Sequence, residues 1–94
     1  MKLSYLNAYL EGCLLEMMEA LESRELQREW FHLFLEEDGS EKWEGRDCLK
    51  DEVKKILDWL DLREDFRNAV WHSIDFYELM EAVIADYKEW LAAE

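Results

Sequence analysis

The sequence has no proline, three glycines and two cysteines, and its 24 acidic residues far outnumber its 11 basic ones. Little therefore interrupts helices, because proline and glycine are the residues that do so most strongly. Cys13 and Cys48 are too few for a disulfide framework and too far apart for a Cys-x-x-Cys metal site. The longest apolar cluster, at 30–35, contains a histidine and is far too short to cross a membrane. These scarcities argue against a disulfide scaffold and a membrane-spanning protein, and they favour helices.

The chain does contain enough apolar material for one core. Half of its 94 residues are hydrophobic and 14% are aromatic, so we expect it to fold despite its charge, with residues 1–94 forming a single domain. The apolar stretch after Lys2 is interrupted by Asn7 and reaches Glu11 too soon for a signal peptide. Two reduced thiols and no leader are typical of a cytoplasmic protein, which is where we expect this one.

Apolar residues recur at steps of three and four, which predicts amphipathic helices. The expected helices are 4–22, 23–37, one carrying Leu49 to Leu60, a short one around Phe66 and Val70, and 74–93. Their expected N-caps after the first helix are Ser23, Asp47, Asp61 and Ser73. A single long bent helix over 4–37 is the alternative to the first two. The fold class is therefore all-α, a single compact bundle of four to five helices.

The net charge of −13 limits the kind of partner that the chain can bind. Nucleic acid and anionic membranes are themselves negative, so we expect direct contact with neither. A basic protein, or a protein complex that binds nucleic acid, is the expected partner. Averaged over an estimated surface, the chain carries about one net charge per roughly 440 Å², against roughly one per 110 Å² on duplex DNA. Only one face, and not the whole surface, could therefore imitate DNA.

Acidic residues gather on one side of the first and last expected helices when their positions are placed about 100° apart. The predicted partner-binding acidic face consists of Glu11, Glu16, Glu19, Glu22, Asp75, Glu78, Glu81, Asp86 and Glu89. The alternative is that each row is an ordinary solvated face. The two rows form one surface only if the first and last helices lie side by side.

The five tryptophans differ in their relation to the apolar stripes. Trp30 and Trp90 fall within stripes and are expected in the core. Trp43, Trp59 and Trp71 fall outside them, and exposed tryptophans of this kind often dominate the energetics of protein interfaces. We therefore predict that these three contact a partner, the alternative being that they cover the ends of a small core.

Patterns that would indicate catalysis or a metal are incomplete. Glu29 and His32 have the Glu-x-x-His spacing of di-iron bundles, but Ala69 occupies the matching position before His72. In the acidic segment 36–44, a calcium-binding EF-hand loop that started at Asp38 would require glycine at the position occupied by Trp43. No phosphate-binding glycine loop or nucleophile motif is present. We therefore expect no catalytic residue, no metal and no cofactor, and a protein that is not an enzyme.

Acidic stretches at 11–22, 36–38 and 75–89 are interleaved with Phe76, Tyr77, Tyr87 and Trp90. In this composition the chain resembles the small acidic anti-defence proteins of bacteriophages, namely antirestriction DNA mimics and some anti-CRISPR proteins. The resemblance spans the chain but includes no shared motif, so no functional residue is carried over. It implies an inhibitor in the host-cell cytoplasm that occupies the basic nucleic-acid-binding surface of its target.

A second hypothesis comes from a different functional class. The chain is then a helical interaction module, such as an immunity protein, an adaptor or a small homodimer, whose acidity serves only solubility. The apolar arc of the second expected helix is unusually broad, because Phe31 and Leu35 extend it. This breadth indicates either a central helix or a dimer surface.

Overall fold

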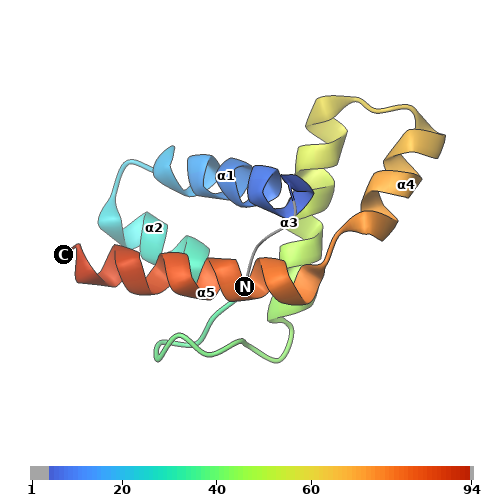
Figure 1. Ribbon diagram of the computed structural model, residues 1–94. Helices are drawn as coiled ribbons and strands as arrows, with labels where there is room; N and C mark the ends of the chain where they lie inside the picture. The colour runs from blue at the N-terminus through green and yellow to red at the C-terminus, as the bar shows by residue number, and fades with distance from the viewer. Residues whose placement is uncertain (1–4, 94) are drawn as a thin grey trace.

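The computed structural model describes residues 5–93, which form five helices and no strand (Figure 1). The helices are α1 (Tyr5–Glu19), α2 (Arg24–Phe31), α3 (Gly45–Leu60), α4 (Glu64–Ser73) and α5 (Phe76–Ala92). One isolated antiparallel bridge joins Leu35 and Glu41 in the connection between α2 and α3. The all-α class and the count of four to five helices are confirmed. Residue 4, where the first helix was predicted to begin, lies outside the described residues.

The first and last helices lie side by side, and both run from the α3 end of the molecule toward the opposite end (Figure 1). The amide of Asn7 donates to the carbonyl oxygen of Asp75 at 2.9 Å, which joins the starts of the two helices. Helix α2 packs beside α1, α3 contacts both α1 and α5, and α4 stands on the outer side of α3 (Figure 1). The adjacency on which a shared acidic surface depends is therefore present.

The core forms where the apolar faces of α1, α2, α3 and α5 meet. Phe31 is completely buried, with its ring centroid 5.1 Å from that of Tyr87 and 5.5 Å from that of Trp90. Trp30 and Trp90 are each only 8% exposed, as predicted. Burial of both Phe31 and Leu35 shows that the broad apolar arc belongs to a central segment of the fold, and not to an exposed dimer surface.

Residues 5–31 form two helices, so the alternative of one bent helix is wrong. Helix α1 ends at Glu19, and Ser23 caps α2 by accepting a hydrogen bond from the Leu26 amide at 3.1 Å. Helix α2 stops at Phe31, well short of the predicted Glu37. The chain turns there, which buries residues 34 and 35 in the core and leaves the Phe34 carbonyl free to accept from the Lys42 amide.

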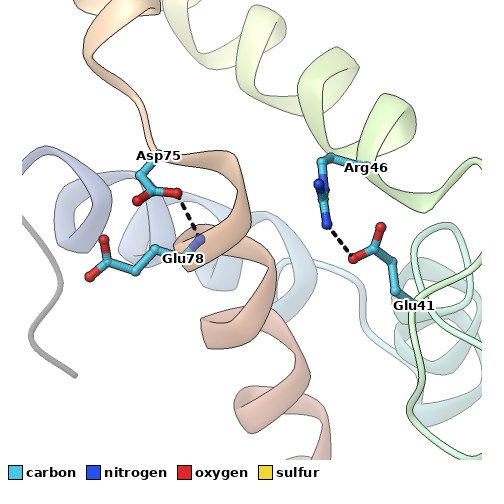
Figure 2. Close-up of polar contacts among 4 residues, drawn as sticks. All are labelled: Glu41, Arg46, Asp75 and Glu78. Carbon is cyan, nitrogen blue, oxygen red and sulfur yellow. Dashed lines mark hydrogen bonds and ion pairs between the residues drawn. The ribbon is translucent and has the colours of Figure 1, made fainter.

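The remaining predicted N-caps are wrong, because α3, α4 and α5 begin at other positions than predicted. Helix α3 begins at Gly45 and places Asp47 in its first turn. Asp61 adopts a left-handed conformation, with φ of 52°, at the end of α3. Ser73 ends α4, where its hydroxyl donates to the Ala69 carbonyl. Asp75 caps α5 by accepting from the Glu78 amide at 3.0 Å (Figure 2).

Helix α3 starts directly against the turn that follows α2. Gly45 is buried there, and a Cβ at this position would overlap the backbone carbonyl oxygen of Phe34. Because the obstacle is main chain, no side-chain rotation can make room. A glycine at 45 is therefore required for α3 to pack against the core.

We expect Gly45→Ala to destabilise the fold by about 1–3 kcal/mol, the usual cost of forcing extra volume into a packed site. Gly12→Ala is the matched control, because nothing lies within 4 Å of a Cβ at that helical position. This second change is expected to stabilise α1 by about 0.5–1 kcal/mol. Urea unfolding followed by circular dichroism measures both, and equal stability of the two variants would contradict the packing described here.

Candidate functional site

Two carboxyl groups meet in the contact between α1 and α5. Glu11 of α1 is partly buried, and its side chain makes a hydrogen bond with the half-buried Asp86 of α5. Burial, this bond and the negative charges of Glu11 and Glu89 together raise the pKa of Asp86 to about 8. The Asp86 carboxyl is therefore largely protonated at neutral pH.

Protonation of Asp86 also allows its buried carboxyl to form a hydrogen bond that the ionised group could not form. With Asp86 ionised, its buried Oδ2 has no hydrogen-bond partner among the described residues. An unpaired carboxylate oxygen away from water is costly, whereas a protonated carboxyl can donate to its neighbour. One of the 24 acidic residues thus contributes no charge to the surface near neutral pH.

Three acidic residues of α5, Glu78, Asp86 and Glu89, fall within one arc of about 80° by their spacing, and Asp86 in this arc meets Glu11 of α1. Glu78 points away from the pair formed by Glu41 and Arg46, and its buried Oε1 accepts no hydrogen bond from the described residues (Figure 2). Together with Glu11, these residues form a row across two helices. We call Glu11, Glu78, Asp86 and Glu89 the acidic seam.

The other predicted acidic residues lie elsewhere. Glu19 and Glu22 are exposed where α1 ends and the connection to α2 begins, and Asp75 is occupied as the cap of α5. Glu16 lies on the opposite side of α1, at a groove shared with α3. The structure therefore brings part of the predicted face together at the seam and distributes the rest around it.

Glu81 belongs to a different cluster, on the edge of α5 that faces the start of α3. It accepts a hydrogen bond from the Tyr77 hydroxyl, which raises the pKa of that phenol. The Arg46 guanidinium lies 5.7 Å from the Tyr77 ring centre and forms a 2.9 Å ion pair with Glu41 (Figure 2). Sequence reasoning missed this cluster, because the tyrosine and its α3 neighbours are far apart in the chain and share no motif.

The three candidate aromatic residues have different surroundings. Trp43 is 95% exposed in the connection before α3, and Trp59 is 79% exposed on α3. Trp71 is partly buried, with its ring centroid 5.1 Å from that of Phe76 and 5.5 Å from the Lys54 ammonium. It covers the joint between α4 and α5, as the alternative for this residue supposed, whereas Trp43 and Trp59 are available to a partner.

The Glu29–His32 spacing does not produce a metal site, because the His32 ring makes contacts within the fold. Its Nδ1 lies 3.0 Å from the Leu35 carbonyl oxygen, and its ring packs edge-on against that of Tyr87. Among residues 5–93, no three histidine, cysteine or acidic side chains are grouped closely enough to hold a metal ion. In the same range, no helix combines the length and hydropathy needed to cross a bilayer.

Comparison with protein-family models, with curated proteins and with solved structures finds no match for this chain.

The Asp86 carboxyl makes stability depend on pH. Between its unfolded value, near pH 4, and about 8, the folded state holds a proton that the unfolded chain has released. Unfolding free energy should therefore fall as pH rises through this window. Asp86→Asn should be about 1–2 kcal/mol more stable than the unmodified protein at pH 8, a value reduced because solvent screens a half-exposed group. The two proteins should converge near pH 4.

Thermal unfolding from acid to mildly alkaline pH tests this expectation. Glu89→Gln is the control, because Glu89 is exposed and makes the smallest contribution to the Asp86 pKa; its stability should fall with pH only slightly less than that of the unmodified protein. A larger gain in the free energy of unfolding for Glu89→Gln than for Asp86→Asn would show that Asp86 is not the main source of the pH dependence.

Proposed function

We propose that this protein is an inhibitor that binds the basic, nucleic-acid-binding surface of another protein and blocks nucleic acid from it. The observation that carries the proposal is the side-by-side packing of α1 and α5. This packing brings Glu11 beside Asp86, on the arc of α5 that also carries Glu78 and Glu89, and Glu19 and Glu22 are exposed where α1 ends. Acidic residues from the two ends of the chain thereby contribute to one region of the surface.

The two helices themselves carry few cations, although Arg24 and Arg28 of α2 lie against the Trp90 ring near the end of α5. Helix α1 contains no lysine or arginine, and α5 contains Lys88 alone. A surface of one sign attracts a basic partner from a distance and accelerates its association. Like-charged neighbours on a helix cost a few tenths of a kcal/mol per pair, so the arrangement gives no benefit to the fold itself.

Close contact requires more than long-range attraction, and the exposed Trp43 supports this part of the proposal. A tryptophan that is 95% exposed can bury a large area against a partner at little cost in side-chain order. Acidic residues supply orientation and speed of association in this arrangement, whereas the aromatic ring supplies much of the affinity.

The proposal predicts that binding weakens when the seam loses charge. The test variant is Glu11→Gln, Glu78→Gln and Glu89→Gln combined, which leaves the protonated Asp86 in place and keeps a hydrogen-bond acceptor at position 11. Its matched control is Asp51→Asn, Asp61→Asn and Glu64→Gln, which removes the same charge from exposed positions on α3 and α4. We expect the first variant to bind its target at least about a hundredfold more weakly, and the control to change affinity less than about fivefold.

The measurement uses the full chain as bait in a bacterial lysate, followed by purified components. The captured protein should shift DNA or RNA in a gel, and the bait should displace the nucleic acid from it. Affinity should fall steeply between about 50 mM and 500 mM salt, because screening weakens contacts between charges. Affinity that is independent of salt, or simultaneous binding of bait and nucleic acid, would refute the proposal.

A further inference from the structure

An apolar groove lies on the surface where α1 crosses α3. Its volume is about 410 Å³, and its lining is almost entirely nonpolar. The residues that line it are Cys13, Glu16, Met17, Ala20, Lys55, Ile56 and Trp59. All of these residues belong to α1, the turn at its end or α3, and no described residue of α2, α4 or α5 contributes to the lining. Exposed apolar surface of this kind is typical of a site where another molecule binds.

The indole of Trp59 forms one wall and is 79% exposed, although Ile56, one turn earlier, is only 5% exposed. A tryptophan beside the core that remains outside it leaves a large apolar area in water. The area is not needed to complete the bundle, because the neighbouring core residues are already buried. It is free to be buried against a partner.

Helix α1 extends the groove into a helix-sized surface. Tyr5, Tyr9, Cys13 and Met17 follow one another at intervals of four residues, the spacing that forms a ridge into which a second helix packs. Tyr5 and Tyr9 are 97% and 49% exposed. From the first tyrosine to Ala20 the ridge spans about 22 Å, or roughly four helical turns.

The charges around the groove favour an occupant that is positively charged. Glu16 stands at its α1 side, and α1 has no basic residue to balance it. Lys55, the one cation in the lining, is held by an ion pair of 2.8 Å with Glu52. A second copy of this chain would bring another 13 negative charges and would be repelled. A segment with lysine or arginine beside its apolar stripe would instead pair with Glu16.

From this groove, ridge and charge we infer that the α1–α3 face binds a basic amphipathic helix of a partner protein. The apolar stripe of that helix packs against Met17, Ile56 and Trp59, and its cations lie beside Glu16. This is the helix-in-groove mode of recognition, in which anchors at helical spacing supply the affinity. This groove is a different surface from the acidic seam. The inference about the groove therefore does not depend on the proposed function.

The probe is a synthetic peptide of leucine and lysine, about 15 residues long to match the ridge, with leucines on one helical face. Binding to the isotopically labelled full chain is followed by NMR, with Cys13, Met17, Ile56 and the Trp59 indole as reporters. We expect shifts concentrated at these residues. A peptide with the same composition in scrambled order should bind at least about tenfold more weakly, since it lacks an apolar face.

Trp59→Ala should weaken the peptide about tenfold or more, as loss of a central anchor does. Trp43→Ala is the matched control, because it removes an even more exposed indole outside the groove and should leave affinity unchanged. Ala20→Glu, which places a carboxylate in the lining, should weaken binding without touching the core. The combined seam variant should still bind the peptide, which separates this inference from the proposed function.

Two outcomes would overturn the inference. Equal binding of ordered and scrambled peptides, unaffected by Trp59→Ala, would show that charge alone attracts them. A dimer of this chain in sedimentation equilibrium that Trp59→Ala dissociates would make a second copy the occupant.

Discussion

The burial of apolar side chains between α1 and α5 is the constraint from which the surface of this protein follows. Leu10, Leu14 and Met18 are nearly or completely inaccessible to solvent, and each such side chain contributes about 1.5–3 kcal/mol. Repulsion between acidic neighbours costs only a few tenths of a kcal/mol per exposed pair. Burial therefore prevails and holds two acidic helices together. The like charges are accommodated at the edges of the contact, where Asp86 keeps its proton instead of losing it.

Local features of the fold could be predicted from the sequence, whereas features that depend on distant partners could not. Ser23 acts within its own helical turn, so its role as an N-cap was visible in the residues around it. The end of α2 at Phe31 depends on the burial of Phe34 and Leu35, and on the closeness of Gly45 to the Phe34 carbonyl. None of these contacts leaves a trace in helical periodicity. Asp61 was a reasonable start for a helix by pattern, but its left-handed backbone instead ends α3.

The same distinction applies to the candidate surfaces. A helical wheel places Glu78, Asp86 and Glu89 on one edge of α5, but it does not reveal that Glu11 lies opposite. Nor does it show that Glu81 faces another cluster, with Tyr77 and Arg46. Trp59 was identified because it falls at the margin of its stripe, whereas the groove beneath it requires two helices to cross. Sequence patterns thus predicted which residues are unusual, and the packing determined which of them act together.

The parallel course of α1 and α5 has an electrostatic consequence of its own. The peptide dipoles of a helix add to about half a negative charge at its carboxyl end, and these two ends lie at the same side of the molecule (Figure 1). Neither helix has a basic residue in its own last turn, but the Arg24 guanidinium of α2 donates to the Trp90 carbonyl oxygen at 2.9 Å and offsets this charge at the end of α5. At the end of α1 the backbone therefore reinforces the exposed carboxylates of Glu19 and Glu22. In the electric field of a basic surface this charge asymmetry favours an orientation in which the end of α1 approaches first.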